Sequence, residues 1–177
     1  MTTLTIDEVK DKIRAIKDFP KEGIIFRDIT TGLKDAKALQ VMIDYMSSEF
    51  KNEKIDYIVG AESRGFIFGT AMAYKMNCGF IPVRKPNKLP AKTISESYGL
   101  EYGTDTIEIH ADAVETGANV LVVDDLLATG GTAVAACNLV RKVGGNLVGA
   151  AFLIELKDLN GREKLHDCGK VISMLQY

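Results

Sequence analysis

The sequence predicts an α/β fold in which a parallel, twisted sheet is flanked by helices. Short apolar runs typical of buried strands alternate with longer segments whose apolar residues recur at helical spacing. Because strands separated by helices usually pair in parallel, this alternation favours a sheet covered on both faces. Two of the expected strands also lead into glycine-containing loops followed by a helix, and parallel sheets bind ligands at such carboxyl ends.

Length and composition agree with one globular domain over residues 1–177. Hydrophobic residues make up 46% of the chain and charged residues 26%, which is an ordinary globular balance. A chain of 177 residues is long enough to bury a substantial core. We therefore expect a single domain, with residues 1–34 as a distinct N-terminal segment.

The elements can be placed in order from hydrophobic spacing and capping residues. Thr5 is expected to cap a helix whose apolar face comprises Ile6, Val9, Ile13 and Ile16. Asp35 is expected to cap a second helix, and its inward residues are Leu39, Met42, Ile43, Met46 and Phe50. Further predicted strands cover residues 55–59, 80–83, 119–123, 146–156 and 170–175, and further helices residues 65–76 and 133–143.

Residues 84–103 interrupt this rhythm. The segment holds the basic residues Arg84, Lys85, Lys88 and Lys92 together with prolines, serines and glycines. A loop of this length in a compact domain is usually functional or disordered. We predict a flexible hood loop that covers the site.

Charge, cysteine count and hydropathy exclude several classes of function. The formal net charge of −2 gives no electrostatic reason for a nucleic-acid partner, and no apolar run has the length of a membrane span. The three cysteines, Cys78, Cys137 and Cys168, are widely spaced, and only two histidines are present, so neither a disulfide framework nor a protein-built metal site is expected. Residues 1–10 contain no apolar signal segment, and a reducing cytoplasmic location is expected.

Residues 120–132 carry the strongest functional pattern. An apolar strand leads into the adjacent carboxylates Asp124 and Asp125, followed by a loop of small residues and a helix start. Unpaired backbone N–H groups at a helix N-terminus bind phosphate, and glycines allow a close approach. Ionised carboxylates beside such a loop can accept from ribose hydroxyls. The loop is expected to hold a 5-phosphate through Ala128, Thr129, Gly130, Gly131 and Thr132.

A second loop, Gly60-Ala61-Glu62-Ser63-Arg64-Gly65, also joins a strand to a helix. Its backbone has the ingredients of an anion nest, and the arginine adds a planar fork suited to phosphate oxygens. A nucleophile elbow is disfavoured because the serine spacing is one residue too long.

Residues 120–132 resemble the 5-phosphoribosyl-1-pyrophosphate (PRPP) signature of type I phosphoribosyltransferases. Within that class, their sequence is most similar to the signature of the adenine phosphoribosyltransferase family. The resemblance also covers residues 19–30, 60–69, 89–103 and 161–165. It implies a pentosyltransferase of purine salvage that converts adenine and PRPP to AMP and pyrophosphate. It further implies Mg²⁺ held mainly by substrate and water, and a homodimer.

The resemblance also assigns further site residues. Pyrophosphate is expected to bind Ala61, Glu62, Ser63 and Arg64, with added positive charge from Arg84, Lys85 and Lys88. The candidate catalytic residues are Glu101 and Arg64. Glu101 is expected to assist proton transfer at the base, and Arg64 is expected to stabilise the leaving group. The N-terminal segment becomes the purine side, and the adenine-binding candidates are Ile25, Phe26, Arg27 and Tyr102.

Three alternatives stay open at this point. A transferase for hypoxanthine, guanine, xanthine or orotate would share the signature. A non-catalytic PRPP-sensing regulator would share the fold, although the residues before the first core strand lack a basic helix-turn-helix pattern. A dinucleotide-dependent oxidoreductase is disfavoured because no G-x-G-x-x-G pattern occurs.

Overall fold

The computed structural model describes residues 4–99 and 103–177. The chain forms two compact units, residues 1–45 and residues 46–177. That both belong to one domain stays a prediction.

The N-terminal unit contains helix α1 (Ile6–Asp11), a hairpin of β1 (Arg14–Lys17) and β2 (Ile25–Asp28), and helix α2 (Thr30–Leu33). Helix α3 (Ala36–Ser48) begins in this unit and ends in the second. Both predicted caps are confirmed. Thr5 and Glu8 form a capping box on α1, and the Asp35 carboxylate accepts from backbone N–H groups at the start of α3.

The first predicted helix is wrong in its length. Helix α1 ends at Asp11, and Ile16 lies in β1, where it pairs with Phe26 of β2. The cause is a competing set of partners for the backbone and side chain of Arg14. Its backbone N–H donates to Thr31, and its guanidinium pairs with the carboxylate of Asp28. Hydrogen bonds between residues distant in sequence thus override the helical spacing of the isoleucines.

The second unit is built on a five-stranded parallel sheet with the order β4-β3-β7-β8-β9. Its strands are β3 (Tyr57–Ala61), β4 (Gly79–Val83), β7 (Asn119–Leu127), β8 (Asn146–Glu155) and β9 (Lys170–Gln176). The helices are α4 (Gly65–Met76), α5 (Gly131–Lys142) and the short 3₁₀ helices η1 (Lys157–Leu159) and η2 (Gly161–Leu165). The predicted α/β fold with a parallel sheet is confirmed.

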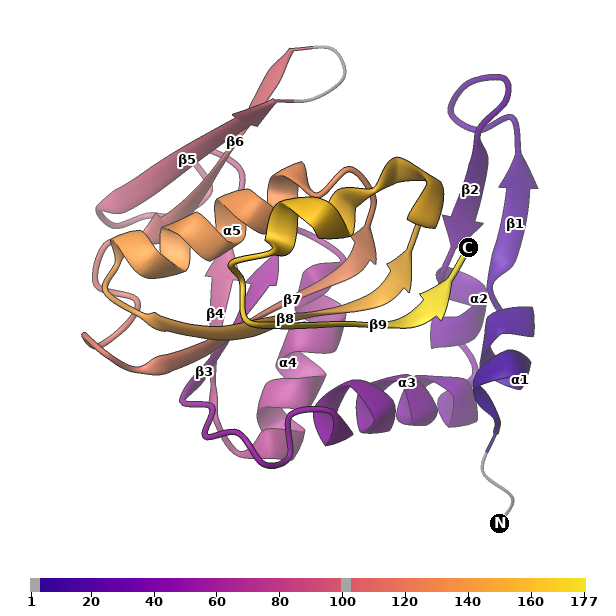
Figure 1. Ribbon diagram of the computed structural model, residues 1–177, viewed down its shortest axis with the longest axis horizontal. Coiled ribbons are helices and arrows are strands. Elements are labelled where there is room, and N and C mark those ends of the chain that lie inside the picture. Colours follow the sequence, from indigo (N-terminus) through magenta and orange to yellow (C-terminus); the bar gives the residue numbers. More distant parts are fainter. Residues whose placement is uncertain (1–3, 100–102) are drawn as a thin grey trace. The chain divides into compact units, whose positions relative to one another are not determined.

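The direction of the strand connections reverses between β3 and β7. The chain moves from β3 outward to β4 through α4, and from β7 outward in the other direction through α5 to β8. Right-handed crossovers in opposite directions put the two helices on opposite faces of the sheet, as Figure 1 shows. The carboxyl ends of β3 and β7 therefore form a switch point, where open sheets bind ligands.

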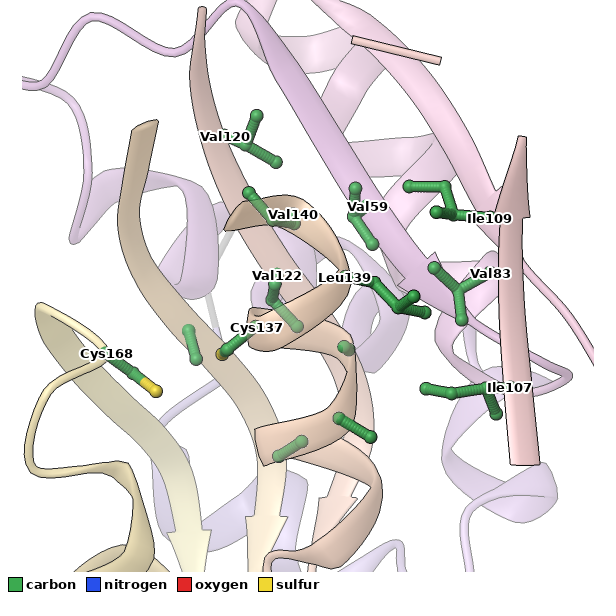
Figure 2. Packing of buried hydrophobic residues seen from close by; sticks show 14 of the residues in the cluster. Val59, Val83, Ile107, Ile109, Val120, Val122, Cys137, Leu139, Val140 and Cys168 are labelled. Carbon is green, nitrogen blue, oxygen red and sulfur yellow. The ribbon is translucent and has the colours of Figure 1, made fainter. Parts of the chain in front are cut away.

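The main core lies between the sheet and α5. Figure 2 shows Val59 of β3 and Val122 of β7 facing Leu139 of α5, all at most 1% exposed. Burying a side chain of this size contributes about 1.5–3 kcal/mol. The core fixes α5, and with it the loop that precedes it, against the carboxyl end of β7.

Two sequence predictions need correction in this unit. Strand β7 continues to Leu127, because residues 124–127 still pair with β8. Asp124 and Asp125 therefore lie within the strand, near its carboxyl end, rather than after it. The hood segment is not wholly a loop: Thr93–Gly99 forms β5, which pairs antiparallel with β6 (Thr104–His110). Along β6 the alternate residues Ile107 and Ile109 are buried and join the core, whereas half-buried and exposed residues alternate along most of β5.

Candidate active site

A cleft of about 300 Å³ opens at the switch point. Its walls come from the loop after β3, the end of β7, the start of α5 and the β5–β6 hairpin. The lining residues are Glu62, Ser63, Arg64, Lys85, Tyr98, Asp105, Ile107, Asp124, Asp125, Leu126, Ala128 and Thr132. The cleft thus brings together residues from both predicted loops, the acidic pair and part of the hood segment.

The acidic pair lies at the floor of this cleft. Asp125 is 5% exposed, and its carboxylate accepts from Nε of Arg64 at 2.9 Å. The Asp124 carboxylate accepts from the backbone N–H of Asp125 at 2.8 Å. Burial raises the pKa of both carboxyls; the negative charge of Asp125 raises the pKa of Asp124 further, whereas Arg64 counteracts the rise at Asp125. Two acceptor groups are therefore held rigidly, at a cost to stability.

We expect Asp124→Asn to raise the free energy of unfolding by about 1 kcal/mol near neutral pH, because asparagine keeps the oxygen acceptor and removes a charge that is costly to bury. The folded-state pKa of Asp124 is raised, so its destabilising effect is absent below the ordinary carboxyl pKa of about 4. The effect grows as pH rises from that value toward the folded-state pKa, and it is constant at higher pH. Denaturant unfolding of wild type and variant across pH 4–8 measures the difference. Asp112→Asn, at an exposed site, is the control. The explanation would be contradicted if the stability difference between Asp124→Asn and wild type became smaller as the pH rises.

The predicted 5-phosphate residues, Ala128–Thr132, form one loop at the start of α5, which we call the phosphate loop. They line a smaller cavity of about 60 Å³. Gly130 precedes the helix at φ +81°, and no described side chain caps the helix start. The first-turn N–H groups of α5 are therefore available to an anion, and the positive end of the helix dipole faces the same cavity.

On the pyrophosphate side, the structure explains how a glutamate fits among anion-binding residues. The carboxylate of Glu62 accepts from Nε and Nη2 of Arg84, both at 3.2 Å, and from the backbone N–H of Lys85 at 3.0 Å. The hydrogen bonds from Arg84 and Lys85 lower the pKa of Glu62, so it is charged at neutral pH. Glu62 is thus partnered by a cation. Lys88 is exposed and does not line the cleft.

Tyr98 and Asp105 are cleft residues that the sequence predictions missed. The Tyr98 hydroxyl donates to Asp105 at 3.1 Å, and the ammonium of Lys85 pairs with the same carboxylate. This hydrogen bond from Lys85 lowers the pKa of Asp105. The Tyr98 ring also packs on Gly131, where a Cβ would approach ring atom Cδ2 to 2.9 Å. The β-favouring residues Thr93, Ile94 and Tyr98 could have indicated the strand, but not its contacts.

The purine-side predictions concern two parts of the chain. Glu101 and Tyr102 lie outside the described residues. Ile25, Phe26 and Arg27 lie in β2 of the N-terminal unit, where Phe26 makes an edge-to-face contact with Phe19 at a centroid distance of 5.2 Å. Ile25 is 47% exposed there, so an apolar surface is available. The adenine-binding role of these residues stays a prediction.

Comparison with known proteins agrees with this geometry. The chain matches the model of the phosphoribosyl transferase domain over residues 30–175. An adenine phosphoribosyltransferase of Brachyspira hyodysenteriae is 62% identical over 158 residues, which cover 89% of this chain and 93% of the relative. The crystal structure of adenine phosphoribosyltransferase from Thermoanaerobacter pseudethanolicus has a TM-score of 0.94 at 51% identity, covering 98% of this chain and 100% of that one.

A third relative was solved with ligands. Adenine phosphoribosyltransferase of Saccharomyces cerevisiae, complexed with adenine and an imino-altritol bisphosphate, has a TM-score of 0.90 at 41% identity and covers 96% of this chain and 98% of that one. The switch-point cleft, with its acidic pair and phosphate loop, defines a protein of the phosphoribosyltransferase class. Its relatives place it more narrowly: the chain belongs to the adenine phosphoribosyltransferase family.

Proposed function

We propose that this chain transfers the 5-phosphoribosyl group of PRPP to adenine and releases AMP and pyrophosphate, a pentosyltransferase reaction of purine salvage. The observation that carries the proposal is the meeting of the acidic pair, the phosphate loop and Arg64 at one cleft, in a chain of this family. Transfer of this kind needs one group to hold the sugar hydroxyls, one to anchor the phosphate and one to stabilise the leaving group.

The reaction is a displacement at the anomeric carbon of ribose, through a loose, oxocarbenium-like transition state. The C–O bond to pyrophosphate breaks as the C–N bond to the base forms. Arg64 and Lys85 line the side of the cleft assigned to pyrophosphate, where positive charge stabilises the departing anion. In this structure Arg64 pairs with Asp125 and Lys85 pairs with Asp105. Pyrophosphate binding would therefore replace one anionic partner of each cation by another.

Binding energy remote from the reacting carbon orients it. The phosphate loop would hold the 5-phosphate through first-turn N–H groups, and Asp124 and Asp125 would accept from the two ribose hydroxyls. Fixing the sugar at both ends converts remote binding energy into correct placement of the anomeric carbon.

We also propose that the reaction uses a magnesium ion carried mainly by the substrate and water. Within residues 4–99 and 103–177, no group of three His, Cys, Asp or Glu side chains could hold a metal. Mg²⁺ keeps several waters and binds substrate phosphates with one or two carboxylates, and Asp124 and Asp125 offer carboxylates at the cleft. When bound, Mg²⁺ would neutralise charge on the departing pyrophosphate.

Adenine is the proposed acceptor because the relatives carry that name and the Saccharomyces cerevisiae relative was solved with adenine. Backbone acceptors near Ile25 and Arg27 would pair with the 6-amino group, and an oxo-purine would leave such an acceptor unpaired at a cost of about 1–3 kcal/mol. Glu101 would assist the proton balance at the base, and closure of the hood would exclude water from the cation-like centre.

A base panel tests this function. Purified protein is given PRPP and Mg²⁺ with adenine, hypoxanthine, guanine, xanthine or orotate, and nucleotide formation is followed for each base. AMP from adenine alone is the expected result. Turnover of another base would overturn the acceptor assignment while keeping the ribose-phosphate site. PRPP binding without any turnover would favour a PRPP-sensing regulator.

We further propose a homodimer formed through α4. This helix presents Ile67, 42% exposed, and Tyr74, 91% exposed, with the partly buried Phe66 beside them. Exposed apolar side chains gathered on one helix indicate an interaction surface.

We also propose a cytoplasmic location, which the three free cysteines support. Within the described residues, no helix is sufficiently long and apolar to traverse a bilayer.

Tyr74→Glu is expected to shift the protein from dimer to monomer at micromolar concentration, because a buried, unpaired carboxylate would oppose association. Sedimentation velocity measures the change. Leu159→Glu is the matched control, since Leu159 is an exposed apolar residue, 42% exposed, outside α4. A wild-type monomer, or a Tyr74→Glu dimer of unchanged affinity, would refute this interface.

A further inference from the structure

The backbone of η2 lies directly against the phosphate loop. A Cβ on Gly161 would lie 2.1 Å from the carbonyl oxygen of Ala128 and 2.8 Å from the backbone nitrogen of Gly130. In the reverse direction, a Cβ on Gly130 would lie 2.6 Å from the carbonyl oxygen of Gly161. These approaches are between backbones, which cannot yield as a flexible side chain can. The position of the phosphate loop is therefore tied to the position of Gly161.

Arg162, the next residue, fixes η2 to the last residue of β8 and to the first half of β9. Its guanidinium donates to both carboxylate oxygens of Glu155, with Nε–Oε1 at 2.9 Å and Nη2–Oε2 at 2.5 Å. It also donates to the carbonyl oxygen of Val171 at 2.8 Å and to the Ser173 hydroxyl at 3.0 Å. The four bonds use the planar fork of arginine, which lysine cannot reproduce.

The carboxylate partner is well suited to a permanent clamp. Glu155 is the last residue of β8 and is 6% exposed. Its register partner on the neighbouring strand β7 is Leu127. The hydrogen bonds from Arg162 lower the pKa of Glu155, so the pair stays charged at neutral pH. At the last residue of η2, Leu165 is 1% exposed in the core with α5. The segment is therefore held near both of its ends, with Gly161 facing the phosphate loop.

We propose that Arg162 is a positioning residue that, through Glu155 and Gly161, holds the phosphate loop in its phosphate-binding conformation. The inference rests on the proposed function and deepens it by assigning a role to residues 161–165. Arg162 lines neither the cleft nor the smaller cavity at the phosphate loop. Its loss lets the loop backbone shift, and the affinity for the 5-phosphate falls, while the pyrophosphate side keeps its own supports, Arg84 on Glu62 and Asp105 on Lys85.

The test compares two ligands that occupy different parts of the cleft. Titration calorimetry on the full chain measures dissociation constants for ribose 5-phosphate and, with Mg²⁺, for pyrophosphate. For Arg162→Lys we expect ribose 5-phosphate to bind about tenfold more weakly, since small displacements of binding groups cost up to about a hundredfold. Pyrophosphate affinity is expected to change less than twofold. Gly161→Ala, which forces the loop backbone to move, should give a larger loss with the same selectivity.

Arg141→Lys is the matched control, because Arg141 also pairs with a carboxylate and a backbone carbonyl, those of Asp167, at the other end of α5. Both affinities should stay at the wild-type value in this variant. Unchanged ribose 5-phosphate binding in Arg162→Lys, or an equal loss for both ligands, would overturn the proposal. A wild-type chain that binds neither ligand would overturn the proposed function itself, before any variant is compared.

Discussion

Asp125→Asn is expected to lower kcat/KM for PRPP by about 10²–10⁴-fold while the protein stays folded. Asp125 is 5% exposed and pairs with Arg64 at 2.9 Å. In the proposed reaction this one carboxylate would bind the ribose and also orient the cation that stabilises pyrophosphate. Hydrogen bonds to a charged group contribute about 1.5–3 kcal/mol each, and losing two gives an effect of this size. Asparagine keeps the shape of the side chain, and burial already disfavours the charged form of Asp125.

Steady-state kinetics with varied PRPP, together with thermal unfolding, measures this effect. The control is Asp167→Asn, which removes the carboxylate of a surface pair with Arg141 whose atoms are 3.3 Å apart. Surface pairs contribute little, so this variant should keep wild-type kinetics. If Asp125→Asn shows normal PRPP kinetics, the ribose contacts lie elsewhere in the cleft.

Glu101→Gln is expected to lower kcat by about 10²–10⁴-fold, the range for loss of a general acid–base group. Glutamine keeps the size of the side chain and its hydrogen-bonding ability but cannot exchange a proton with the purine. The KM for PRPP should change little, because the phosphate loop and acidic pair are untouched. Loss of one limb of the pH–kcat profile would accompany the fall if the residue titrates in the reaction.

Glu53→Gln, at an exposed loop residue outside the cleft, is the control for this substitution. Turnover measured with saturating adenine and PRPP from pH 5 to 10 separates the two variants. An unchanged kcat and pH profile in Glu101→Gln would remove Glu101 from the mechanism and direct attention to other residues of the hood.

Much of the fold follows from local sequence because each element carries its own signal. The apolar run before Asp124 predicts a buried strand, and the glycines after it predict a turn into a helix; both are found in β7 and α5. Capping residues such as Asp35 act within three positions along the chain, so their effect can be anticipated from order alone. The same locality explains why consecutive residues predict the acidic pair and the phosphate loop as site candidates; the structure places both at cavity walls.

Local reasoning failed where a distant partner decided the outcome. Ile16 has helical spacing from Ile13, yet its segment becomes a strand because β2 supplies hydrogen bonds to β1. The prolines and basic residues of the hood segment predict a loop, yet residues 93–99 pair with residues 104–110 and pack on α5 through Glu96 and Asn138. Pairing of this kind depends on register and burial, which no short stretch encodes.

The sequence by itself determined the class of fold, the family signature and the chemical character of each loop, because those properties reside in consecutive residues. Only the tertiary structure decided which charges meet. Glu62 and Arg84 are separated by 22 residues, Lys85 and Asp105 by 20, and the backbones of Gly130 and Gly161 approach each other from different elements. These contacts arise near the carboxyl ends of β3 and β7, where the direction of the strand connections reverses. Packing of the whole unit brings residues from these loops and strands to one cleft.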